Sequence, residues 1–247
     1  MTHKLTDILL QHRASGMLIQ DLPQDLEPQT AEDAYRIQNE TVTALGPVGA
    51  WKVQPMPESG LPFASPILAS NVLADGAAMT AADYPSIGIE VEVAVTLSRD
   101  LPMRDGDYKA EEMPSAIASF HLAFEILASR FVDRSQVAKL TGIADLQHSG
   151  AVVLGPAISF DALPEFGQQP IVLEMDDAPV ASTPGNASTA NMMAALAWLA
   201  NHAAERNLPL KAGNVVITGA RLGPVPLTGR QIKAHAEGLG SVSATFS

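Results

Sequence analysis

Two glutamates, Glu90 and Glu92, have the residue type and the spacing that could do chemistry in this chain. They alternate with the β-branched residues of the run 89–95, which is typical of a buried strand. Side chains two apart on a strand share a face, so both carboxylates should point the same way with their Cα atoms roughly 7 Å apart. Two anions that face a protein interior are costly unless a positive group neutralises them.

A bound cation would supply that positive charge. Ligands that are all oxygens favour a hard ion such as Mg²⁺ over zinc or copper. The competing interpretation is an edge strand whose wet face carries two solvated glutamates. The residue pattern of this strand does not choose between the two.

Glu125 interrupts a second apolar run, 122–127. Glutamate is rarely buried without a partner, and an isolated case is more often a paired core acid than a ligand. Because Glu90 and Glu92 lie in the other run, the interpretation of Glu125 as a metal ligand is favoured over that of a paired core acid. Three carboxylates from two strands would supply about half of an octahedral Mg²⁺ shell and leave room for substrate oxygens and water.

Four further residues could serve such a site. Lys52 ends an apolar run; it either extends to the surface or lies near the metal as an acid, a base or an oxyanion partner. His148 precedes a predicted strand and is either a proton shuttle or a hydrogen-bonded loop histidine. Thr218 and Gly219 end another run, where a hydroxyl and a free backbone N–H could hold an anion; a plain strand end is the alternative.

The elements that must position these residues are mostly short β-like runs separated by turn residues. One helix, 190–206, interrupts them, and the region 1–48 is predicted to be helical, with Thr30 as the N-cap of its second helix. The proline-rich segment 55–66 is expected to be a loop. We therefore expect an α+β fold with an N-terminal helical or cap region, 1–78, and a β-rich catalytic domain, 79–247. The predicted strands are 89–97, 122–127, 151–154, 171–174, 215–218, 231–235 and 241–246.

The composition of the chain excludes several classes of partner and of catalytic site. The chain has 247 residues, 47% of them hydrophobic and 17% charged, which indicates a globular protein with an ample core. A net charge of −12, with no run of basic residues longer than two, argues against nucleic acid or an anionic membrane as the main partner. The absence of cysteine excludes thiolate nucleophiles and cysteine-ligated zinc. No apolar run approaches a membrane span, so a cytoplasmic protein is expected.

The order of several segments resembles the 2-keto-4-pentenoate hydratases, and the related 4-oxalocrotonate decarboxylases, of the fumarylacetoacetate hydrolase superfamily. The resemblance covers nearly the whole chain. The segments that carry it are 51–53 (Trp-Lys-Val), 90–94 (Glu-Val-Glu-Val-Ala), 97–102 (Leu-Ser-Arg-Asp-Leu-Pro), 124–126 (Phe-Glu-Ile), 129–130 (Ser-Arg), 144–145 (Ala-Asp), 210–219 (Leu-Lys-Ala-Gly-Asn-Val-Val-Ile-Thr-Gly) and 237–246 (Glu-Gly-Leu-Gly-Ser-Val-Ser-Ala-Thr-Phe).

This resemblance implies a mixed β-roll after a small helical N-terminal part, and assembly into homo-oligomers. It implies Mg²⁺ or Mn²⁺ held by Glu90, Glu92 and Glu125, with Lys52 as the catalytic lysine. The reaction implied is hydration of a 2-hydroxy-2,4-dienoate from aromatic-compound catabolism, after its conversion to the 2-oxo form. The alternatives are a 2-oxo-3-hexenedioate-type decarboxylase, an acylpyruvate-type C–C hydrolase, and a degenerate structural subunit that associates with a related decarboxylase.

The chain departs from the family pattern where substrates are selected. The loop after Lys52 is short, and an aspartate expected near residue 70 is replaced by Ser70 or Asn71. The family commonly reads Ala-Asp-Asn-Ala-Ser where this chain reads Ala-Asp-Leu-Gln-His at 144–148, so His148 replaces a serine of the site. Ser70, Thr218 and Arg130 are candidate substrate-binding residues, and Arg130 could equally form a structural salt bridge.

Overall fold

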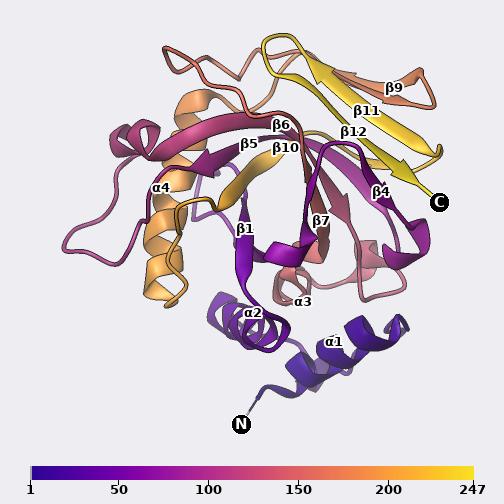
Figure 1. The fold of residues 1–247 in the computed structure, drawn as a ribbon. Coiled ribbons are helices and arrows are strands. Elements are labelled where there is room, and N and C mark those ends of the chain that lie inside the picture. Colours follow the sequence, from indigo (N-terminus) through magenta and orange to yellow (C-terminus); the bar gives the residue numbers. More distant parts are fainter. Residues whose placement is uncertain (1) are drawn as a thin grey trace.

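A computed structural model describes residues 2–247 of the chain (Figure 1). Its N-terminal part contains two helices, α1 (Lys4–Ser15) and α2 (Ala31–Leu45). As predicted, Thr30 caps α2, because its hydroxyl accepts the backbone N–H of Asp33 at 3.1 Å. Together with the short helix α3 (Lys139–Ala144), these helices surround a small core of their own. That core consists of Leu5, Leu9, Ile19, Ala34, Ile37, Phe131, Ile143 and Ala144.

Seven strands form the main sheet, in the order β2-β1-β10-β5-β6-β7-β3. The pairs β1–β10 and β3–β7 are parallel and the others antiparallel. The two edge strands, β2 and β3, are joined only by the turn Ala69–Asn71, so the sheet must curl until its edges approach each other. The strands are β1 (Val48–Val53), β2 (Ala64–Leu68), β3 (Val72–Ala74), β5 (Gly88–Leu97), β6 (Ile117–Leu127), β7 (Ser149–Leu154) and β10 (Val215–Pro226).

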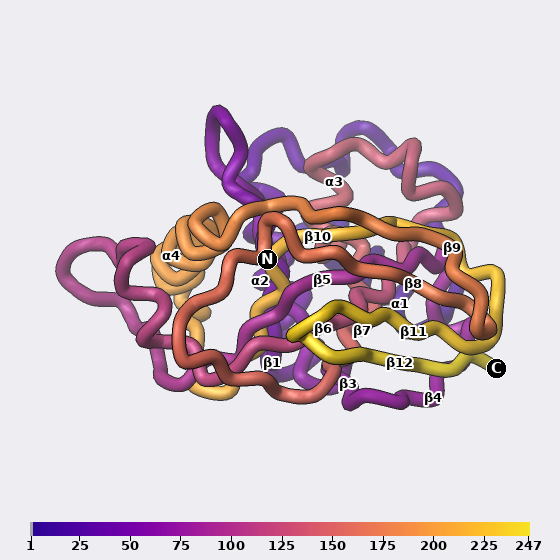
Figure 2. The backbone as a smooth tube through the Cα atoms, turned by 90° about the horizontal axis from the view of Figure 1, so that it is seen from above, coloured from indigo at the N-terminus to yellow at the C-terminus, as the bar shows by residue number. Residues whose placement is uncertain are grey.

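A second sheet of five strands, in the order β4-β12-β11-β8-β9, lies over the outer face of this curl (Figures 1 and 2). Helix α4 (Thr189–Glu205) packs beside it against β1 and β10. The main core fills the space between these layers. The strands of the second sheet are β4 (Ala77–Met79), β8 (Ile171–Met175), β9 (Ala178–Thr183), β11 (Gln231–Ala236) and β12 (Gly240–Phe246).

All seven predicted strands and the helix predicted at 190–206 are present, most with bounds shifted by a few residues. The segment 48–53 is a strand rather than part of the helical region, which ends at Leu45. β1, β2 and β3 belong to the main sheet although they lie within 1–78, and β2 begins inside the expected loop 55–66. These strands were missed because β1 pairs with β10, far away in the sequence, and local periodicity carries no trace of such a partner.

Within residues 2–247, none of the helices combines the length and the apolar character needed to cross a membrane.

The junction between α2 and α4 contains a half-buried aromatic cluster around His202. The ring of His202 stacks on Trp198 with centroids 4.6 Å apart, and Tyr35 of α2 lies 4.4 Å away on the same measure. Burial, and then the nearby charge of Arg206, lower the pKa of His202 from 6.5 to about 4. The folded protein therefore keeps this imidazole neutral where the unfolded chain would protonate it.

We expect the free energy of unfolding to fall as the pH is lowered from 6.5 to about 4, because the unfolded chain binds more protons at His202 in this window. The contribution of this residue should be about 1–3 kcal/mol. A His202→Phe variant keeps a stacked ring but cannot titrate, so its stability should fall less over the same range. Urea unfolding at several pH values measures this, and parallel curves for the two proteins would contradict it.

Candidate functional site

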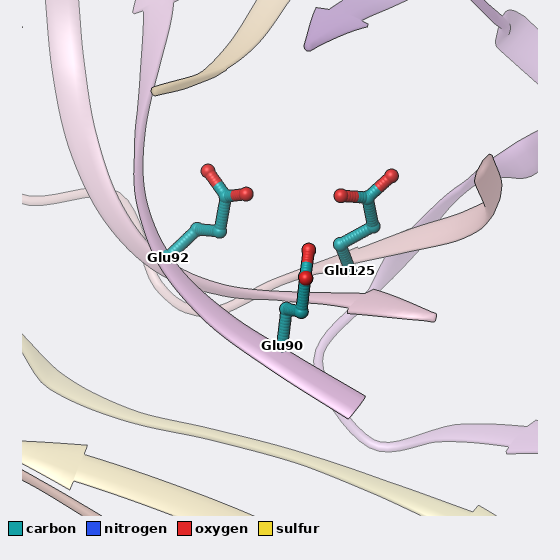
Figure 3. A group of neighbouring side chains, drawn as sticks. All are labelled: Glu90, Glu92 and Glu125. Carbon is teal, nitrogen blue, oxygen red and sulfur yellow. The ribbon is translucent and has the colours of Figure 1, made fainter. Parts of the chain in front are cut away.

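Three carboxylates meet on the concave face of the main sheet (Figure 3). Glu90 and Glu92 come from β5, and Glu125 lies on β6 directly opposite Glu90 in the strand register. One oxygen from each carboxylate lies within 4.8 Å of the others. The shared face predicted for Glu90 and Glu92 is confirmed, and the antiparallel register adds Glu125 to it.

The position of β5 excludes the interpretation as a wet edge strand. β5 is paired on both sides, with β10 and β6. Glu92 is 1% exposed, Glu125 is 0% exposed, and Glu90 is mostly covered. The alternate residues of β5 face the main core, so the strand must direct its glutamates to the concave side. There a small apolar cluster adjoins them: Ala50, Ile67, Ala94, Ala123, Val152, Val215 and Ile217.

Burial and mutual repulsion make this cluster costly in its fully ionised form. Burial raises the pKa of Glu90 to about 7, and burial together with the charges of Glu125 and Glu90 raises the pKa of Glu92 well above its ordinary value. Oε1 of Glu125 has no hydrogen-bond partner among the described residues, and Oε2 meets only Nζ of Lys52. Three buried carboxylates beside one lysine leave a surplus of negative charge and free oxygen lone pairs, which fits a divalent cation.

Lys52 is the one cation within salt-bridge distance of this cluster among the described residues. Its Nζ lies 2.7 Å from Oε2 of Glu125, and its side chain is 12% exposed. Burial alone would lower the pKa of Lys52, but the charges of Glu125, Glu90 and Glu92 outweigh it and raise the pKa. Of the two interpretations open from the sequence, a lysine at the carboxylates is therefore the observed one.

Gly219 closes the other side of the site. Its backbone N–H donates a hydrogen bond of 2.7 Å to Oε2 of Glu92. The residue has φ +101°, and a Cβ there would lie 2.5 Å from Cδ of Pro55. Glycine is therefore required both for the left-handed backbone and for the close approach of the loop after β1.

The hydroxyls of the predicted substrate-binding residues Thr218 and Ser70 already have hydrogen-bond partners. The hydroxyl of Thr218 donates to the carbonyl of Val93 at 2.7 Å, and the neighbouring Gly219 N–H is bonded to Glu92. Ser70 is exposed, and its hydroxyl donates to Oδ1 of Asn71 at 3.2 Å. Substrate binding by either residue stays a prediction that these contacts do not support.

Arg130 forms the structural salt bridge that the sequence left open. Its Nε lies 2.7 Å from Oδ1 of the fully buried Asp145, and Arg13 of α1 reaches the same oxygen at 2.9 Å. Despite burial, the charges of Arg130 and Arg13 hold the pKa of Asp145 well below its ordinary value. Both arginines also line a cavity of about 510 Å³, whose lining includes none of the three glutamates.

Asp145 begins an unusual turn, Leu146–His148, between α3 and β7. Leu146, Gln147 and His148 have φ values of +53°, +52° and +58°, in the left-handed region that residues with a Cβ avoid. Each such residue costs of order 1 kcal/mol, and strain of this kind persists only where the surroundings enforce it. The ion pairs of Asp145 are what anchor the start of the turn.

His148 points back into this network. Its Nδ1 lies 3.2 Å from Oγ of Ser129 and 3.4 Å from Oδ2 of Asp145, while Nε2 packs close to Gly142. These contacts agree with the second interpretation of His148 from the sequence, a hydrogen-bonded loop histidine. A role for His148 in proton transfer stays a prediction, and none of its recorded polar partners is a residue of the carboxylate cluster.

Arg13, Gln38 and Gln147 were not singled out from the sequence. Gln38 of α2 is fully buried and donates to Oγ of Ser65 at 2.7 Å and to the carbonyl of Ile143 at 2.6 Å, so it ties α2 to β2 and α3. A glutamine among the apolar positions of α2 was a visible signal. The left-handed φ of Gln147 and the distant partner of Arg13 left no signal in the sequence.

Comparison with known proteins identifies the family. Residues 36–247 match the model of the fumarylacetoacetate (FAA) hydrolase C-terminal family. The chain belongs to the FAA hydrolase family. A 2-keto-4-pentenoate hydratase of Burkholderia vietnamiensis (strain G4 / LMG 22486) is 33% identical over 185 residues, which cover 73% of this chain and 68% of the relative. The TodF product hydratase of Pseudomonas putida (strain F1) is 30% identical over 262 residues, which cover 99% and 94% of the two chains.

The fold of this FAA hydrolase family member also matches a solved structure. The 4-oxalocrotonate decarboxylase from Pseudomonas putida G7, complexed with magnesium and adipate, superposes with a TM-score of 0.86. The match covers 100% of this chain and 97% of that one at 22% identity. The expected fold, a small helical N-terminal part followed by mixed sheets of the FAA hydrolase type, is thereby confirmed.

Because its pKa is raised, we expect the ionised Glu90 to lower the stability of the metal-free protein although it contributes to metal binding. An acid with a raised folded pKa destabilises the fold above that pKa. At pH 8 in EDTA, Glu90→Gln should therefore increase the free energy of unfolding by about 1–3 kcal/mol. Saturating Mg²⁺ should stabilise the wild type and give little stabilisation to the variant.

Urea unfolding with EDTA and with Mg²⁺ measures both effects. Glu58→Gln, in the exposed loop after β1, is the matched control and should keep the stabilisation by Mg²⁺. A Glu90→Gln protein that is less stable than the wild type in EDTA would contradict the charge-repulsion argument.

Proposed function

We propose that this chain is a metal-dependent hydro-lyase that hydrates a 2-hydroxy-2,4-dienoate through its 2-oxo-3-enoate form, a reaction of aromatic-compound catabolism. The observation that carries the proposal is the buried cluster of Glu90, Glu92 and Glu125 with Lys52 held against Glu125. The hydratases at 30% and 33% identity support the reaction class.

Glu90, Glu92 and Glu125 would hold Mg²⁺ or Mn²⁺, since all three offer hard oxygen donors. When bound, the ion supplies positive charge beside the carboxylate and 2-oxygen of the substrate and so stabilises negative charge there. The protein's own part is to hold the three oxygens together. It also places an apolar surface next to them, which keeps water away from that side.

Lys52 would hold the proton at the 2-oxygen. Its raised pKa keeps the ammonium protonated beside Glu125, so it can donate a hydrogen bond to an oxygen that develops negative charge. The reaction moves the proton of the 2-hydroxyl to C5, which leaves a double bond between C3 and C4. A water molecule then adds its hydroxyl to C4 and its hydrogen to C3.

Two further reactions could use the same residues. Decarboxylation of a 2-oxo-3-enedioate also develops negative charge at the 2-oxygen, so the cluster and Lys52 would serve it equally; C–C hydrolysis of an acylpyruvate needs a positioned water in addition. A degenerate subunit has no physical reason to keep three buried carboxylates together. Homo-oligomers, association with a related decarboxylase and a cytoplasmic location belong to the same proposal.

An assay of dienol absorbance with Mg²⁺ tests the proposal. 2-Hydroxypenta-2,4-dienoate should be consumed only with the metal, and identification of the product separates hydration from decarboxylation. Lys52→Met should lower turnover by about 10²–10⁴-fold and still bind Mg²⁺, whereas Glu92→Gln should lose both. Lys233→Met, at an exposed lysine of β11, is the control and should leave turnover unchanged. If the protein binds the metal but turns over no 2-oxo or 2-hydroxydienoic acid, the proposal of a hydro-lyase is wrong.

His148→Ala tests the remaining prediction for that residue. If His148 transfers a proton, the variant should lose turnover by at least about 10²-fold while substrate binding persists. Undiminished turnover would remove the catalytic role and leave His148 as part of the Asp145 network. His148→Gln, which can still hydrogen-bond, serves as the comparison for structural damage.

A further inference from the structure

Arg134 lies over the start of β5, on the face of the sheet that carries Glu90. The position that a Cβ would take at Gly88 is 2.6 Å from Nη2 of Arg134 and 3.0 Å from Nη1. Gly88 precedes Glu90 by two residues, and both are paired with β6 in the same antiparallel register. Alternate residues of a strand share a face and lie roughly 7 Å apart. The guanidinium therefore lies on the concave side of the sheet, about one such step from Glu90 toward the beginning of the strand.

The glycine at position 88 provides the room for this guanidinium. Its φ lies outside the left-handed region, so a residue with a Cβ could adopt the same backbone conformation. The atoms that a Cβ would meet first belong to Arg134, and they are the far end of a flexible side chain. A methyl group at this position would therefore displace Arg134 and leave the strand in place.

Part of the Arg134 guanidinium is free to bind a ligand. Its Nη1 donates to the carbonyl of Ser86 at 2.9 Å, which holds the half-buried side chain against the loop before β5. Among residues 2–247, Nη2 and Nε have no acceptor and neither atom is fully buried. The carboxylate of the adjacent Asp133 instead accepts the backbone N–H and the hydroxyl of Ser135. Arg134 thus presents its charge and open N–H donors toward solvent.

The charge of Arg134 extends to the carboxylate cluster. Burial is the main cause of the raised pKa of Glu90, and the charges of Lys52 and Arg134 oppose that rise. Lys52 is already held at 2.7 Å from Glu125. When a divalent ion is bound, the ion and Lys52 together offset the three carboxylates. The charge of Arg134 is then left over for an incoming anion.

Arg221 is a second arginine whose charge interacts with the cluster, through Glu92. It is only 4% exposed, and its Nη1 donates to the carbonyl of Ala187 at 2.6 Å. Its Nη2 contacts Sδ of Met192 and Oγ1 of Thr218. Arg221 is thus enclosed between β10 and the start of α4, whereas an acid that arrives from solvent can reach Arg134.

We propose that Arg134 binds the carboxylate of the 2-oxo acid substrate beside the metal site and so orients the acid. The guanidinium would donate to the carboxylate oxygen that faces the start of β5, with the 2-oxygen toward Lys52. Arginine suits this task, because its planar N–H donors match a carboxylate and its charge persists at neutral pH. In a chain with a net charge of −12, an anionic substrate also needs such a local cation. This inference rests on the proposed function.

Binding of an unreactive 2-oxo acid tests this role without requiring turnover. Calorimetry would titrate 2-oxopentanoate, a saturated monoacid, into the Mg²⁺-loaded protein. Arg134→Met should weaken its binding by at least about 10-fold, because a charge-assisted hydrogen bond is lost. Titration of Mg²⁺ into the metal-free proteins should show equal or tighter binding by the variant, since a positive charge near Glu90 has been removed. Damage to the cluster would weaken Mg²⁺ binding instead.

Gly88→Ala tests the same contact while the arginine stays in the chain. Its methyl group should displace the guanidinium and weaken the binding of 2-oxopentanoate, again without weakening Mg²⁺ binding. The double variant should bind the acid no more weakly than Arg134→Met, because both changes remove one interaction. Arg230→Met, at an exposed arginine just before β11, is the matched control and should bind both ligands as the wild type does.

The possible failures are distinguishable. Equal binding of 2-oxopentanoate by the wild type and Arg134→Met would overturn the role of Arg134 and leave the proposed function standing. Parallel losses of Mg²⁺ and acid affinity in Arg134→Met and Gly88→Ala would also overturn it, because a purely structural role predicts them. No binding of 2-oxopentanoate by the Mg²⁺-loaded wild type would overturn the proposed function and this inference together.

Discussion

Three carboxylates buried on one concave face, with a single lysine against them, are the constraint on which the rest of this structure depends. The arrangement of the strands holds these carboxylates together in spite of the free-energy cost of burying them. The central strand β5 must be paired on both sides, its alternate residues must fill the main core, and β6 must bring Glu125 opposite Glu90. The curl of the sheet turns this face inward, and β1 then brings Lys52 within 2.7 Å of Glu125. The raised pKa values of Glu90 and Glu92 indicate that Lys52 alone does not neutralise the negative charge of the cluster.

The N-terminal helices are tied to the turn before β7 through one buried acid. Arg13 of α1 and Arg130 after β6 converge on Asp145, which anchors the left-handed turn that carries Gln147. Gln38 of α2 adds a second tie, between β2 and α3. Ion pairs of this kind are costly to break because one partner is left buried and uncompensated. The helical region and the turn before β7 are therefore expected to respond together to changes at Asp145.

The carboxylate cluster is compatible with more than one reaction of the proposed class. In the proposed function, a metal ion held by Glu90, Glu92 and Glu125 would stabilise negative charge at a 2-oxygen together with Lys52, and hydration, decarboxylation and C–C hydrolysis would all need that. The cluster thus establishes a class of chemistry rather than one reaction. This chain departs from the pattern of the hydratases it resembles on the segment after β1 and on the turn before β7.

The sequence by itself predicted seven of the strands, the long helix, the cap at Thr30 and the common face of Glu90 and Glu92, because periodicity and capping are local properties. It also indicated Glu125 and Lys52, through acids and a lysine set in apolar runs and through the family resemblance. Only the tertiary structure decided that β1–β3 belong to the main sheet, that Arg130 is bound to Asp145, and that Thr218 and Gly219 are already hydrogen-bonded. It alone showed Arg13 and Gln147, because a partner more than 100 residues away and a positive φ follow from packing, which no local pattern records.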